Sequence, residues 1–484
     1  MGAHPLRIGL RVLSNPHWRG GINYIINWSA ALSALPDEER PEIILLPFDE
    51  AGEHLVKEWP IKVDGVAPFA AAGQLELDFV YPATQIFEAP FGVPWAGWIP
   101  DWQCKHLPEM FSPLERSRRD LHYKLLAKES PALALSSRMA LEETMRLVPD
   151  AVDAHVLHFP VLLSDADRAA LSDVSKLLAK HGLPERYVIV CNQFWRHKNH
   201  ALVLEALARI KSSDLVCVMT GEMHDERWPQ YIEDLRRLTE RPEIASHLRL
   251  LGSISRREQL ALMAHAVAIV QPSLFEGWST VVEEARLLGV PSLLSRFPVH
   301  EEQNPPKSRF FDPQNPDELT AMLDEVWSQP TDLMRRSHAD VEQDRFSQSC
   351  ARSFLALAKS ARKNYVAEKN GPAAILARLI AGLPVAEPGS IEAELEARIY
   401  SGARAMFKMQ PHALAEFDFF CEKEGEIAAA RAEKNIIHII RKQAALGKLA
   451  EAVIPVSLPS QGHLLRLFDS TKRVAWSVKR FLRL

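Results

Sequence analysis

The sequence predicts an α/β protein with two doubly wound domains and a helical C-terminal extension. Over residues 1–365, short β-rich apolar runs alternate with segments of helical periodicity, which is typical of parallel sheets covered by helices. Beyond Lys363 the strand signals vanish, and Ala, Glu, Lys, Arg and Leu dominate. The length of 484 residues suffices for roughly two to four domains that each bury a core.

The N-terminal half begins with a βαβ-like unit. Its predicted elements are a strand at 6–13, a loop containing Gly20-Gly21, a helix at 22–35 and a strand at 43–46. We place the N-terminal domain at residues 1–170, with the boundary falling between Pro160 and Pro184.

The second α/β domain is placed at residues 171–364 and the helical extension at 365–484. The predicted elements of the second domain are strands at 187–191, 215–220, 248–251, 266–270 and 292–295, with a helix at 200–210. Neither half carries G-x-G-x-x-G after its first strand, which argues against a dinucleotide-dependent dehydrogenase.

The composition excludes several classes of protein. A net charge of −5 gives no global attraction to nucleic acid. No apolar run reaches the ~18 residues of a membrane span, and the start lacks the apolar region of a signal peptide. The five cysteines are scattered without metal-ligand spacing, as expected of reduced thiols. We therefore expect a cytoplasmic protein.

The most informative segment contains two glutamates, Glu276 and Glu284, eight residues apart. Apolar runs before and after it indicate strand–loop–helix–strand, and Thr280 with Glu283 fits a capping box that starts the helix near Thr280. The free N–H groups of a first helical turn bind anions. Carboxylates on either side of a diphosphate could accept hydrogen bonds from hydroxyls, which fits a nucleotide-sugar.

This segment resembles the donor-binding signature of retaining glycosyltransferases of the family 4 type, the glycosyl transferases group 1. It has Glu-x7-Glu, with Gly277, Gly289 and Pro291 in the expected places. Many relatives have Phe-Gly-Leu-Pro where this chain has the four residues from Trp278 to Val281. The resemblance covers about the first three-quarters of the chain. It implies the GT-B fold, in which two Rossmann-like domains face each other across a cleft.

The resemblance also implies roles for individual residues. Glu276 would contact the donor hexose, and Glu284 the nucleotide ribose. The donor-binding residues expected between them are Gly277, Trp278, Ser279 and Thr280. The alternative is a glutamate-rich surface helix with its cap, which Glu283 would illustrate.

A second candidate site element is the loop from Asn192 to His200, which delivers cations to the edge of the sheet where ligands bind. We expect Lys198 and Arg196 to bind the diphosphate, each contributing roughly 1.5–3 kcal/mol. Lys198 would also stabilise the departing diphosphate. Lys198 matches the family. Gln193 fills the slot of a family Arg, and whether Arg196 replaces that Arg stays open, with a solvated loop as the alternative.

The acceptor side is predicted in the N-terminal domain. The Gly20-Gly21 turn resembles a family turn that faces the cleft, with Gly21 beside the donor. In the aromatic-rich stretch 95–111, Asp101 is the candidate to accept a hydroxyl hydrogen bond, and His106 could add an imidazole. Cys104 stands where close relatives are expected to have His. The alternative is a packed loop with Asp101 as a cap.

Three further patterns could indicate a phosphate contact or a metal site. A basic helix follows the aromatic stretch, and either solvent or an acceptor phosphate could face its cations Arg116, Arg118, Arg119, Lys124 and Lys128. Asp165-Ala-Asp167 matches the Asp-x-Asp of metal-dependent glycosyltransferases but favours a helix cap, and the stretch 300–303 lacks two histidines at helical spacing. We expect no metal and no cofactor.

The tail from Leu464 to Leu484 predicts a basic amphipathic helix. It could lie on an anionic membrane, although packing on the protein itself or on a partner is favoured.

The sequence thus predicts a metal-independent, retaining glycosyltransferase with catalytic candidates Glu276, Lys198 and Asp101. Its substrates would be a nucleoside-diphosphate sugar and a glycan or lipid-linked acceptor, in polysaccharide biosynthesis. An inactive glycosyltransferase-like interaction protein, acting through its helical tail, is the alternative. A phosphorylase or epimerase on the same fold is a weaker option.

Overall fold

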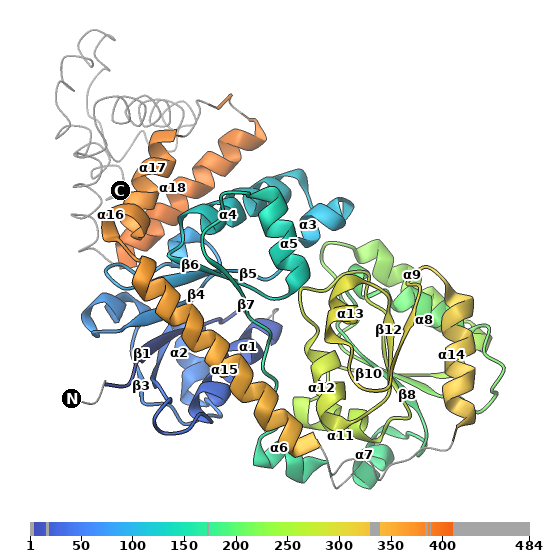
Figure 1. The fold of residues 1–484 in the computed structure, drawn as a ribbon. Helices are drawn as coiled ribbons and strands as arrows, with labels where there is room; N and C mark the ends of the chain where they lie inside the picture. Colours follow the sequence, from blue (N-terminus) through green and yellow to red (C-terminus); the bar gives the residue numbers. More distant parts are fainter. Residues whose placement is uncertain are drawn as a thin grey trace, which may run out of the picture.

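Two parallel β-sheets with flanking helices form the body of the protein (Figure 1). The structure, a computed structural model, describes residues 4–15, 19–171, 174–329, 339–382, 386–387 and 389–409. The N-terminal sheet has seven strands in the order β3-β2-β1-β4-β5-β6-β7, and the C-terminal sheet has six in the order β10-β9-β8-β11-β12-β13. The predicted pair of doubly wound α/β domains is present.

The N-terminal sheet reverses its strand order between β1 and β4. Its strands are β1 (Arg7–Val12), β2 (Glu42–Pro47), β3 (Gly65–Val66), β4 (Phe79–Ala83), β5 (Trp95–Ile99), β6 (Ala132–Leu135) and β7 (Ala154–Val156). Strands β4, β5 and β6 are buried on both faces and therefore lack the apolar–polar alternation that reveals a strand in a sequence. Sequence analysis found only β1 and β2 in this sheet.

The C-terminal sheet reverses its order between β8 and β11. Its strands are β8 (Val188–Cys191), β9 (Cys217–Thr220), β10 (Leu248–Gly252), β11 (Ile269–Gln271), β12 (Ser292–Ser295) and β13 (Ser308–Phe311). The first five lie within about three residues of the predicted strands. Only β13, on the sheet edge, was missed.

Helices cover both faces of each sheet. In the N-terminal domain these are α1 (Arg19–Ser33), α2 (Glu50–Lys57), η1 (Phe69–Gln74), η2 (Ile86–Glu88), α3 (Gln103–His106), η3 (Pro108–Met110), α4 (Pro113–Glu129) and α5 (Arg138–Leu147). The next helices are α6 (Asp165–Ala170), α7 (Val174–His181), η4 (Arg196–Lys198), α8 (His200–Leu207), α9 (Pro229–Thr239), α10 (Pro242–Ala245), α11 (Arg256–His265), α12 (Thr280–Leu288), α13 (Pro298–Gln303) and α14 (Pro316–Ser328).

The chain returns to the N-terminal domain after the second sheet. Helix α15 (Ala339–Asn364) crosses the front of the N-terminal sheet in Figure 1. Its Phe354 is fully buried and contacts the rings of Trp28, Phe79 and Tyr81. Residues placed in the second domain by sequence thus belong to the core of the first.

The described part of the extension covers the opposite face of the same sheet. It comprises α16 (Ala367–Asn370), α17 (Pro372–Gly382) and α18 (Ile391–Met409), which lie beside α4. Buried residues of α17 and α18 share a core with β5, and Trp95 Nε1 donates a hydrogen bond to the Asn370 carbonyl (3.1 Å). The predicted tail helix 464–484 lies outside the described residues.

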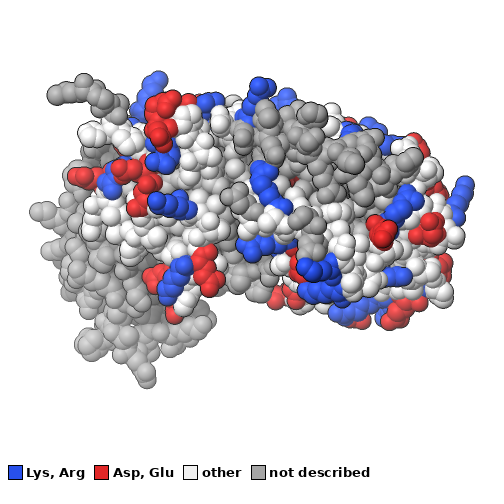
Figure 2. Space-filling view, turned by 90° about the horizontal axis from the view of Figure 1, so that it is seen from below, with Lys and Arg blue, Asp and Glu red and all other residues white. Residues whose placement is uncertain are grey.

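The surface carries no broad field of one sign on the face seen in Figure 2, where basic and acidic side chains lie interspersed over the described part of the molecule. Within the described ranges, no helix combines the length and apolarity required to cross a membrane.

Candidate donor and acceptor site

The candidate site lies where the C-terminal sheet reverses its order. Strands β8 and β11 are neighbours there, and each ends in an amide: Asn192 Nδ2 donates to Gln271 Oε1 at 2.9 Å. The loops after these strands are the two that sequence analysis selected. Open α/β sheets bind ligands outside the carboxyl ends of strands at such a reversal.

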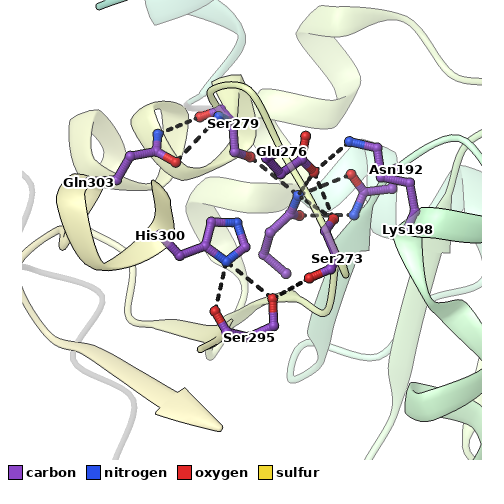
Figure 3. A network of polar contacts seen from close by, with 9 residues as sticks. Asn192, Lys198, Ser273, Glu276, Ser279, Ser295, His300 and Gln303 are labelled. Atoms are coloured by element: carbon purple, nitrogen blue, oxygen red, sulfur yellow. Dashed lines mark hydrogen bonds and ion pairs between the residues drawn. The ribbon is translucent and has the colours of Figure 1, made fainter. Parts of the chain in front are cut away.

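Glu276 is the centre of a buried polar network (Figure 3). Its Oε1 accepts hydrogen bonds from Lys198 Nζ (2.5 Å), Ser273 Oγ (2.7 Å) and Gln271 Nε2 (3.0 Å). Burial alone would raise the pKa of the Glu276 carboxyl, but Lys198 and its other polar neighbours outweigh burial and hold the pKa below its usual range. The side chain is therefore a fixed anion, paired with Lys198 across the two loops.

Helix α12 follows this network and begins at Thr280, as predicted, but its cap differs from the prediction. Ser279 is the N-cap, without a side-chain cap hydrogen bond, so the predicted Thr280–Glu283 capping box is absent. Instead Gln303 of α13 bonds the Ser279 backbone, accepting from its N–H (3.3 Å) and donating to its carbonyl (2.8 Å). The same amide donates to Glu283 Oε1 at 2.9 Å.

Glu283 is not a surface residue, contrary to the expectation. It is 1% exposed and also accepts a hydrogen bond from Arg286 Nε (2.9 Å). A pattern of glutamates on one helix did not indicate which of them would be buried, because α13 covers this face of α12.

Glu284 lies buried one turn inside α12 and faces Arg256 of α11, whose Nη2 is 3.3 Å from Glu284 Oε1. Burial raises the pKa of the Glu284 carboxyl, and Arg256 offsets only part of that rise. Arg256 also donates to the Leu162 carbonyl (3.3 Å) in the segment joining the domains. Sequence analysis did not find Arg256, since nothing local links α11 to the motif.

The β8–α8 loop places its two candidate cations differently. Lys198 is 14% exposed and reaches Glu276, whereas the Arg196 guanidinium lies over the Trp228 ring, 4.3 Å from its centroid. Gln193, in the slot of the family Arg, accepts a hydrogen bond from the Glu222 N–H (2.9 Å). Lys198 therefore lies in the network around Glu276, and Arg196 is held against the β9–α9 loop.

Asp101 faces this network from the N-terminal domain. A Cβ added at Gly277 would lie 2.5 Å from the Pro100 carbonyl and 3.1 Å from Asp101 Cβ. Only glycine permits this approach of the two domains. Burial raises the pKa of the Asp101 carboxyl, and Arg119 of α4 offsets part of the rise. Asp101 Oδ1 also accepts a hydrogen bond from the Gln103 N–H (2.9 Å), although the N-cap position of α3 belongs to Trp102.

The other predicted cleft residues have structural partners. His106 lies against Phe275, with ring centroids 5.1 Å apart, and 3.7 Å from Glu143. Trp278 stacks on His158 of the other domain at 4.2 Å. Gly20 and Gly21 lie in the first turn of α1 rather than in a preceding loop.

The two walls nearly close on each other. The space between them has a volume of about 10 Å³, room for about one water molecule. Asp101, His106 and Glu143 line it from one domain, and Glu276 and Gly277 from the other. Two predicted acceptor residues, Asp101 and His106, thus meet two predicted donor residues, Glu276 and Gly277, in one cleft.

Arg227, in the β9–α9 loop, was missed by sequence analysis. Its guanidinium lies 5.9 Å from the Phe111 ring of the N-terminal domain and 6.0 Å from the Trp195 ring. The sequence could have pointed to Arg227 through Trp195 and Trp228, two aromatic residues in loops that follow strands. Only the fold shows that these two loops are adjacent.

The Asp165-Ala-Asp167 stretch, which matches the Asp-x-Asp of metal-dependent glycosyltransferases, caps a helix, as predicted. Ser164 and Asp167 form a reciprocal capping box at the start of α6. Among the residues that the structure describes, no group of three or more His, Cys, Asp or Glu side chains is arranged to hold a metal ion.

The chain is similar to known glycosyltransferases in sequence and in fold. Residues 174–341 match the family Glycosyl transferases group 1. The fold resembles HepE from Anabaena in complex with UDP and glucose, at 18% identity over 73% of this chain and 100% of that chain (TM-score 0.55). It also resembles a glycosyltransferase from Rickettsia africae, at 15% identity over 74% of this chain and 100% of that chain (TM-score 0.52).

A third similar structure is sucrose-phosphate synthase from Thermosynechococcus elongatus, at 15% identity over 77% of this chain and 96% of that chain (TM-score 0.50). No curated protein matches the chain by sequence. The predicted resemblance to GT-B glycosyltransferases is confirmed: the chain has the GT-B fold, and its residues 174–341 match the Glycosyl transferases group 1 family.

Proposed function

We propose that this protein is a retaining, metal-independent glycosyltransferase. It transfers a sugar from a nucleoside-diphosphate sugar to a glycan or lipid-linked acceptor in cytoplasmic polysaccharide biosynthesis. The observation that carries the proposal is the buried Glu276–Lys198 pair at the strand-order reversal, facing Asp101 across the cleft. The match to Glycosyl transferases group 1 supports it.

The donor would extend along the start of α12. Lys198 and the N–H groups between Gly277 and Thr280 are placed to bind the diphosphate. Glu276 accepts hydrogen bonds from the sugar hydroxyls, and Glu284 from the ribose. HepE structures hold UDP and UDP-glucose, so UDP-linked sugars are the first donors to test. The donor is a substrate, and no separate cofactor is required.

The acceptor would enter beside Asp101, whose carboxyl accepts a hydrogen bond from an acceptor hydroxyl next to the attacking one and so orients the acceptor. The acceptor oxygen then bonds to the anomeric carbon on the face from which the diphosphate departs. The bond from that carbon to the phosphate oxygen breaks, and the hydroxyl proton passes to the departing phosphate. The configuration is thereby retained. Lys198 stabilises the charge that develops on the leaving group.

The test compares wild type with Glu276→Gln in transfer and hydrolysis of a panel of UDP-sugars. We expect the variant to lose about 10²–10³-fold in kcat, the scale of removing one preorganised polar contact to a transition state. Glu226→Gln, which changes an 80% exposed side chain, should retain full activity. Equal rates for wild type and Glu276→Gln would contradict the proposed role.

Metal independence is tested in the same assay after dialysis against a chelator. Activity should persist, because the proposed phosphate ligands are Lys198 and backbone N–H groups. Loss of transfer with rescue by a divalent cation would instead assign a metal site.

The alternative of an inactive interaction protein has one observation in its favour. Gln193 replaces the family Arg and is held by the neighbouring loop. That alternative requires that no nucleotide-sugar is turned over by purified protein.

Peripheral contact of the tail 464–484 with anionic membranes belongs to the proposal of a lipid-linked acceptor. Pelleting with anionic liposomes, full-length against a chain ending at Gln461, tests that contact.

A further inference from the structure

A second cavity, of about 310 Å³, lies between the N-terminal domain and the helical extension. Residues of the β2–α2 loop, η2, α4 and α18 line it, among them Phe87, Glu88, Arg118, His122 and Arg398. Its volume is within the range of small-molecule sites. None of these residues belongs to the donor–acceptor cleft, which uses Arg119 and the C-terminal domain instead.

The cavity occupies a favourable place in the fold. Phe48 follows β2 and Gln85 follows β4, so the cavity lies at the carboxyl ends of strands on either side of β1. The N-terminal sheet reverses its strand order between β1 and β4. This is the position where open α/β sheets bind ligands. Here α18 of the extension supplies the second wall.

The charge of the cavity favours an anion. Glu88 is neutralised by the buried Arg11, whose Nη2 lies 2.7 Å from Glu88 Oε2. No carboxylate among the described residues forms an ion pair with Arg118. Arg398, on the α18 wall, forms its ion pair within the described ranges with Glu394, one turn away on its own helix (3.3 Å). Two guanidinium groups thus border a space in which the one lining carboxylate is already paired.

His122 supplies a polar group that lacks a partner. Its side chain is 7% exposed, and Nδ1 has no hydrogen-bond partner in the described part of the chain. Burial, reinforced by Arg118, lowers the pKa of His122 to about 4, so the imidazole is neutral near pH 7 and can donate or accept one hydrogen bond. Unpartnered buried polar groups are costly, and a ligand atom would satisfy this one.

The rest of the lining is apolar. Phe48, Phe87 and Met406 contribute hydrophobic surface, and the Phe87 ring meets the His122 ring edge-on at 5.6 Å. We propose that this cavity binds a small organic anion, a phosphate or carboxylate carried on an apolar body. The anionic group lies between Arg118 and Arg398, within reach of His122, and the apolar body packs on the phenylalanines.

Calorimetric titration of the full-length protein tests the proposal with four probes. Phenyl phosphate and benzoate carry both features, inorganic phosphate lacks the apolar body, and benzyl alcohol lacks the charge. We expect phenyl phosphate or benzoate to bind at least about tenfold more tightly than the last two, because inorganic phosphate lacks the apolar contact and benzyl alcohol lacks the charge-assisted one. The preferred probe identifies the anion. Failure of both aromatic anions to bind would overturn the proposal.

Variants locate the binding site. Arg118→Met should weaken binding about tenfold or more, and Ser401→Trp, which fills the cavity, should abolish it. Arg116→Met changes an exposed arginine of the same helix and should have no effect. Lys198→Met removes the cation of the donor cleft and should leave this binding intact. Binding lost in Lys198→Met but retained in Arg118→Met would place the probe in the donor cleft and contradict the inference. Thermal unfolding of each variant checks that it is folded.

Discussion

The residues that carry the proposed chemistry could largely be predicted, because each lies in the loop that follows a strand. Glu276, Lys198 and Asp101 were selected from sequence, and all three lie around one cleft. Their partners could not be predicted. Arg256 and Gln303 are far from the residues they bind, and only the packing of α11 and α13 on α12 brings them together.

Glu284 provides a test of the nucleotide end of the site. Glu284→Gln keeps the side-chain volume but replaces the charged acceptor, so we expect affinity for UDP to fall about tenfold, the loss of one charge-assisted hydrogen bond. Wild type should discriminate UDP from its 2′,3′-dideoxy analogue, and the variant should not. A variant that discriminates between the two nucleotides as wild type does would exclude the ribose contact. Calorimetric titration measures all four affinities.

His200 predicts a dependence of stability on pH. It is fully buried against Phe194, and burial followed by Lys198 lowers its pKa from 6.5 to about 3. Below pH 6.5 the unfolded chain binds a proton that the folded protein does not. Stability from this residue is therefore complete above about pH 6.5 and is lost as the pH falls toward 3. Between pH 7.5 and 5.0 the loss is about 2 kcal/mol.

Chemical denaturation at the two pH values measures this loss. In His200→Leu the decrease in unfolding free energy between them should be smaller by about that amount. His224→Leu changes a 60% exposed side chain. Its unfolding free energy should decrease between the two pH values by as much as that of wild type. An unchanged pH dependence in His200→Leu would show that this imidazole does not resist protonation in the folded state.

At the scale of elements, local signals were reliable where the chain supplies its own cap. The helix cap predicted at Asp165-Ala-Asp167 is present, as a capping box of Ser164 and Asp167. The Thr280 box is absent, since the buried amide of Gln303 occupies the position that a cap would fill. Strands β4 to β6 escaped detection because burial on both faces removes alternation. A local pattern therefore fails where a distant element supplies the partner.

Helix α18 depends on one close contact. A Cβ at Gly402 would lie 2.6 Å from the Phe87 ring of η2, so Gly402→Leu must displace the helix or the ring. We expect destabilisation of about 1–3 kcal/mol, the scale of overpacking a filled core. Ala397→Leu adds a side chain on the exposed face of the same helix and should change stability little. Thermal unfolding decides, and equal melting of both variants would show that α18 does not require this contact.

At the scale of the whole molecule, the two-domain architecture could be predicted, but the path of the chain could not. The apolar residues of α15 predict a helix, but they do not indicate which of the two sheets this helix packs against. Phe354 finds its pocket among Trp28, Phe79 and Tyr81, more than 270 residues earlier. Contacts of this kind attach α15 to the first domain. In the sequence, the second domain therefore lies between two segments that both belong to the core of the first.

The closed arrangement of the two domains depends on Glu302 of α13. Its carboxylate accepts hydrogen bonds from the Arg138 N–H at the start of α5 (2.9 Å) and contacts His158 Nε2 (2.8 Å). Arg138 and His158 belong to the N-terminal side of the cleft, and His158 also stacks on Trp278 of the donor loop. A carboxylate at a helix N-terminus is favoured by the helix dipole, so Glu302 joins the walls that carry Asp101 and Glu276.

Glu302→Ala should therefore open the cleft. Charge-assisted hydrogen bonds contribute about 1.5–3 kcal/mol, and their loss would lower the closed fraction and reduce kcat by roughly tenfold or more, since both substrates must be held between the walls. In small-angle X-ray scattering with saturating UDP, Glu302→Ala should have a larger radius of gyration than wild type. Glu301→Ala is the matched control, because the Glu301 side chain is 49% exposed and pairs with Arg296 of its own domain. If Glu302→Ala scattered and turned over as this control does, closure would have to rest on the other contacts between the domains, among them the Gly277 contact and the His158–Trp278 and His106–Phe275 ring contacts.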